Sequence, residues 1–111
     1  MDGDKTRICV LFDIYGELLT PSVAESIDLY YNDDLSLSEV AENAGISRQG
    51  VRDNLRRGIE LLEHYEQKLG LYGKYRENEK TVIGIKAEID RPDVPEDLRE
   101  RLVSLIDKLS F

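Results

Sequence analysis

Cysteine and long apolar segments are scarce in this sequence. The single cysteine, Cys9, cannot form an intrachain disulfide, and its apolar neighbours predict a buried thiol in a protein of the reducing cytosol. No run of about 18 apolar residues occurs, and the apolar run at residues 8–12 is too short for a signal peptide. We therefore expect a cytoplasmic protein that is neither secreted nor inserted in a membrane.

The sequence also lacks the residue patterns of common catalytic sites. It contains no phosphate-binding loop, no metal-ligand spacing and no nucleophile with a matching base. The only histidine, His64, stands four residues from Glu60 and from Lys68, as on a solvent-exposed helix face. The pairs Asp33-Asp34 and Glu96-Asp97 fit a turn and a helix start, where acids are favoured without chemistry. We expect no enzyme, no cofactor and no metal.

Basic residues are outnumbered by acidic ones. The 111-residue chain has 15 Lys and Arg against 23 Asp and Glu, a net charge of −8. The field of the whole chain therefore repels a phosphate backbone, and any nucleic-acid surface has to be local. A charged share of 34% with a hydrophobic share of 41% favours amphipathic helices, and the length fits one compact domain with an extension.

Apolar spacing predicts two helices in the first third of the chain. Apolar residues recur every three or four positions over 8–19, with Leu18 and Leu19 on the inner face and Gly16 weakening the end. Thr20 and Pro21 form a helix start, because proline suits the first helical turn. The second helix is predicted to run from there to about residue 32.

A helix-turn-helix is predicted over residues 36–55. Ser36 and Glu39 match a capping box that begins a third helix, and Gly45 ends it. Ser47 then caps a fourth helix that continues to Gly70, with an apolar face formed by Val51, Leu55, Ile59, Leu62 and Leu69. A small residue at Ala41, glycine in the turn and a branched residue at Val51 are typical of the motif.

The C-terminal third allows two interpretations. Residues 81–89 alternate as in a strand, but over 71–89 the apolar residues step by four and three, which favours a helix. After a proline-bounded linker at 91–95, leucines repeat at the same spacing: Leu98, Leu102, Leu105 and Leu109. We predict an all-α chain with a helix-turn-helix domain at 1–70 and a helical extension at 71–111. The extension is expected to bury its leucines in the chain or in a homodimer.

Positive charge is concentrated on the fourth helix. Four arginines, Arg48, Arg52, Arg56 and Arg57, lie within ten residues against one acid, Asp53, so this segment has a local charge of +3. Such a cluster in an acidic chain is the pattern of a nucleic-acid contact. The alternative is a solvated helix face in which the arginines pair with Glu60 and Glu63.

The chain resembles two known groups of proteins. Residues 19–21, 37–41 and 46–52 (LTP, LSEVA and ISRQGVR) are similar to region 4 of bacterial sigma factors, a match that covers roughly residues 19–62. Over its whole length, including the start at 9–16 (CVLFDIYG), the chain resembles the YlxM family of small Gram-positive proteins. That resemblance implies a regulator or accessory of the signal recognition particle pathway, with particle components as partners.

The sigma resemblance also implies roles for five side chains. Arg48, Gln49 and Arg52 would read base edges in the major groove, while Arg56 and Arg57 would contact phosphates. The chain departs from the sigma pattern at Asn54, where an apolar residue is usual, and at Gly50, where a longer side chain is usual.

Two classes of function follow from these patterns. One is a DNA-binding or RNA-binding regulator, supported by the arginine cluster, and the other is a protein-interaction adaptor, supported by the net charge. Three tyrosines beside basic residues resemble a stacking platform for single strands, but core or interface packing is the favoured interpretation: Tyr65, Tyr72 and Tyr75.

Overall fold

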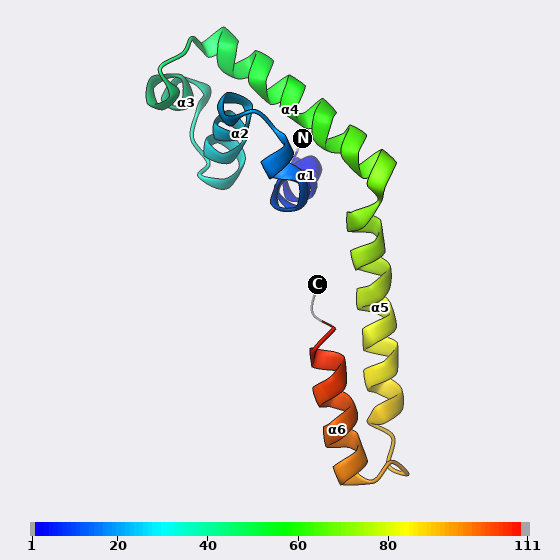
Figure 1. Cartoon of the computed structure of the whole chain (residues 1–111). Coiled ribbons are helices and arrows are strands. Elements are labelled where there is room, and N and C mark those ends of the chain that lie inside the picture. The colour runs from blue at the N-terminus through cyan, green and yellow to red at the C-terminus, as the bar shows by residue number, and fades with distance from the viewer. Residues whose placement is uncertain (1, 110–111) are drawn as a thin grey trace. The chain divides into compact units, whose positions relative to one another are not determined.

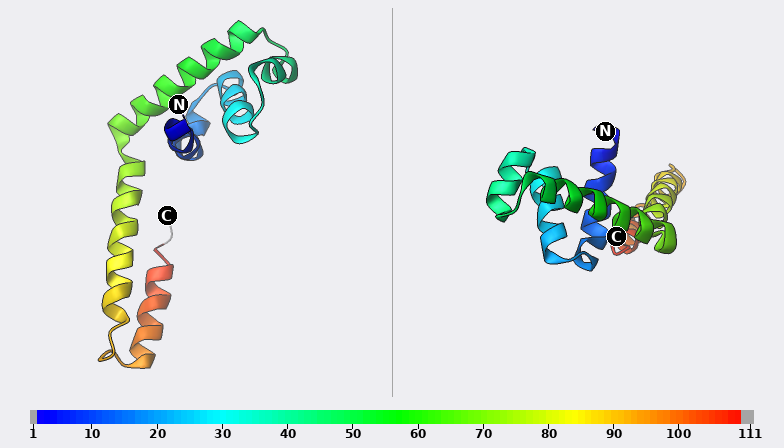
Figure 2. Two further views of the ribbon diagram at one scale, coloured as in Figure 1. Left: turned by 180° about the vertical axis from the view of Figure 1, so that it is seen from behind. Right: turned by 90° about the horizontal axis from the view of Figure 1, so that it is seen from above.

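The computed structural model describes residues 2–109, with side chains from Lys5 onward, and its regular elements are helices (Figures 1 and 2). They are α1 (Asp2–Tyr15), η1 (Gly16–Leu18), α2 (Pro21–Ile27), η2 (Asp28–Asn32), α3 (Leu37–Ala44), α4 (Arg48–Leu69), α5 (Leu71–Ile89) and α6 (Glu96–Asp107). Residues 2–109 contain no strand, which confirms the all-α prediction and the helical interpretation of 81–89. The predicted domain at 1–70 and the predicted extension at 71–111 include residues 1, 110 and 111, which lie outside the described part of the chain.

The helices form two compact units that divide after Tyr72. In the first unit, α1, α2 and α3 pack against one side of α4, as both views show (Figures 1 and 2). Its core consists of buried apolar side chains from all four helices and the turn before α2: Ile8, Leu11, Tyr15, Leu19, Val23, Ile27, Val40, Ala41, Val51, Leu55 and Leu62. This core holds α3 and the start of α4 in place.

A glycine allows α2 and α4 to cross closely. Gly58 is buried in α4, and a Cβ atom added there would lie 2.9 Å from Ile27 Cδ1 and 3.0 Å from Val23 Cγ1. Because Ile27 and Val23 are themselves buried, they have little room to withdraw. The spacing pattern of α4 did not identify this contact, since glycine carries no apolar signal.

Polar contacts connect α1 to the far half of α4. Arg7 donates to Glu63 through Nε at 2.7 Å and Nη2 at 2.9 Å, a bidentate ion pair. The hydroxyl of buried Tyr15 donates to Glu66 at 2.7 Å and accepts from the Leu71 backbone amide at 3.1 Å. The second of these bonds satisfies a backbone amide in the first turn of α5. The preceding residue, Gly70, has a φ of 64° and ends α4, as predicted.

The second unit is a hairpin of α5 and α6. Ile89 and Ile106 are its buried residues within the described part of the chain. Arg99 closes the connection, because its guanidinium donates to the backbone carbonyls of Ile89 at 3.2 Å, Arg91 at 3.0 Å and Val94 at 3.3 Å. A charged side chain thus satisfies the carbonyl of the last residue of α5 and contacts two carbonyls of the linker before α6.

Several side chains lie differently from the prediction. Leu18 is 58% exposed because α1 ends at Tyr15 and a 3-10 turn, with three residues per turn, redirects the chain. Leu69, predicted on the apolar face of α4, is 57% exposed because it lies past the last buried turn of that helix. The Cys9 thiol, predicted to be buried, is only partly buried beside the Tyr31 carbonyl. In α6 the inward residue is Ile106, whereas three of the four predicted seam leucines are exposed: Leu98, Leu105 and Leu109.

None of the described helices is both long enough and apolar enough to cross a lipid bilayer.

Candidate nucleic-acid interface

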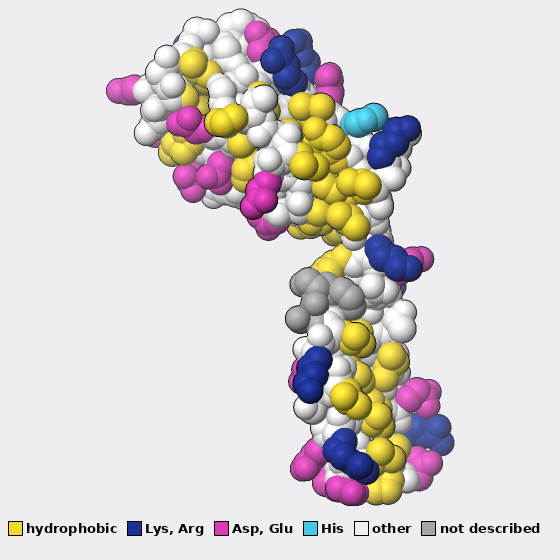
Figure 3. Space-filling view, in the orientation of Figure 1, with side chains coloured by type: hydrophobic (Ala, Val, Ile, Leu, Met, Phe, Trp, Pro, Cys, Tyr) yellow, Lys and Arg dark blue, Asp and Glu magenta, His cyan; other side chains and the backbone are white. Residues whose placement is uncertain are grey.

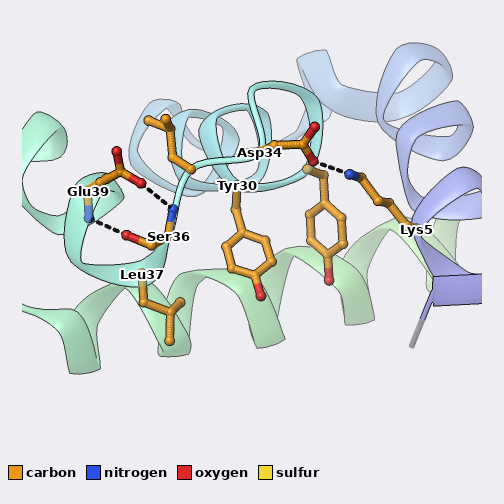
Figure 4. A pocket seen from close by; sticks show the side chains of 8 residues that line it. Lys5, Tyr30, Asp34, Ser36, Leu37 and Glu39 are labelled. Atoms are coloured by element: carbon orange, nitrogen blue, oxygen red, sulfur yellow. Dashed lines mark hydrogen bonds and ion pairs between the residues drawn. The ribbon is translucent and has the colours of Figure 1, made fainter.

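The first helix of the predicted motif begins with a capping box. The Ser36 hydroxyl accepts from the Glu39 amide at 3.1 Å, and the Glu39 carboxylate accepts from the Ser36 amide at 3.0 Å (Figure 4). Both bonds were predicted from the sequence. The hydrogen bonds from the Ser36 amide and hydroxyl hold the pKa of Glu39 below its usual value, so this carboxylate stays ionised at the start of α3.

The turn of the motif also has its predicted geometry. Gly45 ends α3 with a φ of 68°, a left-handed conformation that glycine adopts without a steric cost. Ser47 then caps α4, and its hydroxyl accepts from the Gly50 amide at 2.9 Å. Ala41 and Val51 are buried where α3 and α4 meet. Residues 36–55 are therefore a helix-turn-helix, and α4 is its second helix.

The predicted contact residues are all exposed on α4. The buried face of this helix carries Val51, Leu55 and Leu62, which turn inward against the other helices. The opposite face and one flank carry the five residues that the sequence analysis singled out: Arg48, Gln49, Arg52, Arg56 and Arg57. The structure thus brings them together on one accessible surface, which we call the α4 surface.

An acidic residue divides the α4 surface. Asp53 accepts a hydrogen bond from Gln49 Nε2 at 3.1 Å and lies 3.5 Å from Arg56 Nη2. Basic and acidic side chains alternate along the outer edge of α4 (Figure 3). Glu63, which the alternative interpretation paired with these arginines, is engaged instead by Arg7, and that ion pair lowers the pKa of Glu63.

Three arginines of the α4 surface keep free guanidinium groups. Within residues 2–109, Arg48, Arg52 and Arg57 make no hydrogen bond or ion pair with another side chain. Guanidinium groups without partners are suited to bidentate contacts with phosphate oxygens or a guanine edge. The α4 surface therefore presents three guanidinium groups without partners, while Asp53 offsets the charge of Arg56 between them.

The two departures from the sigma pattern have local structural roles. Asn54 Nδ2 donates to the Ser22 carbonyl, to Ser22 Oγ and to Ser26 Oγ, at 3.3, 3.2 and 3.1 Å. Ser26 is fully buried, so this amide satisfies a core hydroxyl and connects α4 to α2. A Cβ at Gly50 would lie 3.2 Å from Ser47 Oγ, so glycine leaves room for the cap. The sequence analysis did not predict the hydrogen bonds of Asn54 with α2. The signal for them was a polar residue at a position that is usually apolar.

A hollow of about 540 Å³ lies between α1, η2 and the start of α3 (Figure 4). Tyr30 projects into the space below the capping box, and Lys5 pairs with Asp34 at its other end. Asp34 has a φ of 57°, which shapes the turn into α3. The charged side chains of the hollow are thus engaged, Lys5 with Asp34 and Glu39 with Ser36, and the lining of the hollow includes no residue of the α4 surface.

The structure also places the other residues that the sequence analysis considered. His64 is exposed on α4, as predicted, and Tyr65 and Tyr72 pack against the core, as the packing interpretation requires. Tyr75 is 39% exposed in the second unit. No group of three or more potential metal ligands occurs among the described residues.

Comparison with known proteins identifies the family. Residues 3–102 match the family UPF0122, described as "Putative helix-turn-helix protein, YlxM / p13 like". The UPF0122 proteins of Bacillus cereus (strain Q1) and Bacillus anthracis (strain A0248) are each 41% identical to this chain over 104 residues, covering 94% of both sequences. The description names a helix-turn-helix and no catalytic activity. These matches confirm the resemblance to the YlxM family, and the chain belongs to the YlxM/p13-like family of helix-turn-helix proteins.

Proposed function

We propose that this protein is a helix-turn-helix regulator that binds duplex DNA through the α4 surface. The start of α4 is the recognition segment. Arg48, Gln49 and Arg52 face the base edges of the major groove, and Arg56 and Arg57 contact the backbone one or two turns further on. The observation that carries this proposal is the exposure of all five side chains on one surface of a rigidly packed helix.

The charge distribution sets the character of this binding. The net charge of −8 opposes approach to DNA, so the free arginines have to act at short range. In the unbound protein Gln49 and Arg56 contact Asp53, and both side chains have to leave this carboxylate before they contact DNA. Asp53 therefore reduces their contribution to the DNA affinity. We therefore expect weak binding to random sequence and a strong dependence on salt.

A titration of labelled random duplex DNA tests the proposal. Each phosphate neutralised contributes about −0.9 to the slope of log K against log salt, so four arginines limit the slope to about −4 per protomer. We expect measurable binding at about 50 mM salt and a slope between about −2 and −4. Absence of binding at that salt concentration contradicts DNA binding.

A second candidate is an adaptor of the signal recognition particle pathway, as the family resemblance implies. One observation favours it: α3 carries Glu39 and Glu42 on its exposed surface and neither Lys nor Arg. In a DNA-bound helix-turn-helix, the first helix crosses the phosphate backbone, where these carboxylates are unfavourable. The adaptor candidate predicts no duplex affinity at about 50 mM salt, together with co-purification of a particle component. A parallel titration with the particle's RNA distinguishes RNA binding from duplex DNA binding and from the absence of nucleic-acid binding.

A further inference from the structure

Apolar side chains are exposed on the second unit to an unusual extent. Leu105 is 58% exposed, Ile85 38% and Leu98 37%, although the unit contains only residues 73–111. Hydrophobic side chains follow the length of the α5–α6 hairpin on the face seen in Figure 3. Continuous apolar surface of this kind is uncommon on a monomer and is typical of an interaction surface.

The size of the unit indicates that something covers this surface. Units of about 40 residues or fewer usually need a disulfide, a metal ion or association with another chain to be stable. The only cysteine of the sequence, Cys9, belongs to the first unit, and no potential metal site occurs among the described residues. Two buried residues, Ile89 and Ile106, form a small core for a helical hairpin. Association is the remaining means of stabilisation.

One side of the hairpin carries both a groove and a ridge. The groove has a volume of about 430 Å³ and lies between α5 and α6, and its lining includes Gly84, Ile85, Leu98 and Leu102. A Cβ atom at Gly84 would meet no atom within 4 Å, so another helix has room to approach. Leu98 and Leu102 form the α6 wall of this groove, and spacings of four and three continue their row to the exposed Leu105, so the rim of this wall forms the ridge.

A surface that contains a groove beside a matching ridge is complementary to itself. A two-fold interface requires this property, because the same patch of both chains meets across the axis. Two hairpins joined in this way form a four-helix bundle, in which leucine rows pack into the facing grooves. We propose that the second unit is a dimerisation element whose α6 ridge inserts into the α5–α6 groove of a second copy of this chain. The proposal does not depend on DNA binding.

The mass of the full-length protein in solution tests this proposal. The chain has a mass of 12.7 kDa, and we expect sedimentation equilibrium to give twice this value. At about 100 μM chain, a dimer with a micromolar Kd is almost fully formed, so a monomer at that concentration overturns the proposal. A monomer is also the result expected if the apolar surface is covered by the first unit of the same chain.

Three substitutions identify the face. Leu105→Glu places a charge on the ridge and is expected to give a monomer with unchanged helix content. Leu18→Glu is the matched control, because Leu18 is also 58% exposed but lies in the first unit, and it should leave the dimer intact. Ile83→Glu alters the opposite side of the hairpin, beside Tyr75 and Leu109, and should also preserve the dimer. A dimer that survives Leu105→Glu, or dissociates with Ile83→Glu, contradicts the assigned face.

Discussion

At the scale of single residues, Gly58 determines how closely α2 approaches the helix that carries the α4 surface. An alanine in its place favours a helix interior by roughly 0.5–1 kcal/mol. The added Cβ, however, would lie 2.9 Å from two atoms of Ile27, which is fully buried. Overpacking of this kind costs about 1–3 kcal/mol and exceeds the gain in helix propensity.

We predict that Gly58→Ala lowers the free energy of unfolding by about 1–2 kcal/mol, measured by urea denaturation followed by circular dichroism. Ile27→Val removes one of the two crowded atoms and by itself costs about 0.5–1.5 kcal/mol. The double variant should therefore be more stable than the sum of the single effects predicts. Strict additivity, or a stabilising Gly58→Ala, contradicts the close crossing.

Residue-scale prediction succeeded where a side chain has a local partner and failed where the partner is distant in sequence. The bonds between Ser36 and Glu39 and the left-handed Gly45 follow from patterns of three or four neighbouring residues. The contacts of Asn54 with α2 and of Arg99 with the end of α5 depend on how helices pack, which no local pattern contains. Asp53 was recognised as the only acid of the arginine cluster, but its hydrogen bond with Gln49 was not predicted.

At the scale of elements, α1 is attached to α4 by the ion pair of Arg7 and Glu63. Both side chains are 40% exposed, so solvent screening limits the contribution to about 1 kcal/mol or less. The hydrogen bonds from Arg7 hold the pKa of Glu63 below its usual value, and the same contact raises the pKa of Arg7. A carboxyl group with a lowered pKa stabilises the fold above its unfolded-state pKa and loses this effect as the pH falls.

We predict that Glu63→Gln destabilises the protein at pH 7 by about 0.5–1 kcal/mol, as measured by thermal or urea denaturation. The difference from wild type should shrink as the pH falls through the lowered pKa of Glu63 and vanish once this carboxyl group is protonated in both the folded and the unfolded state. Glu60→Gln removes the same charge from an exposed position on α4 and should show no such trend. An equal effect of both variants at every pH rules out the ion pair as the cause.

The prediction of elements was most accurate where a capping residue or a glycine marks a boundary. Ser47 and Gly70 bound α4 as expected, and the four-and-three spacing of 71–89 correctly favoured a helix over a strand. The end of α1 was less certain from sequence, because Gly16 only weakens a helix and Leu18 and Leu19 continued the apolar pattern. The face of α6 was predicted only in part, since Ile106 turns inward in place of three of the four leucines.

At the scale of the whole molecule, local and total charge oppose each other. The chain has a net charge of −8, while the segment 48–57 has four arginines and one aspartate. The central claim is that this segment contacts nucleic acid. A local contact can be distinguished from an effect of the total charge by comparing one arginine of the segment with a matched arginine elsewhere in the chain. Arg56 is 71% exposed and lies 3.5 Å from an acid on its own helix, and Arg101 of α6 is 72% exposed and lies 3.8 Å from one.

The most direct measurement compares the salt dependence of duplex DNA binding for Arg56→Ala and Arg101→Ala. Both variants lose one positive charge, so they change the net charge of the chain equally. We predict that Arg56→Ala makes the slope of log K against log salt shallower by about one unit, because one phosphate contact is lost. Arg101→Ala should keep the wild-type slope. If both variants change the slope equally, or neither does, the α4 surface is not the site of contact.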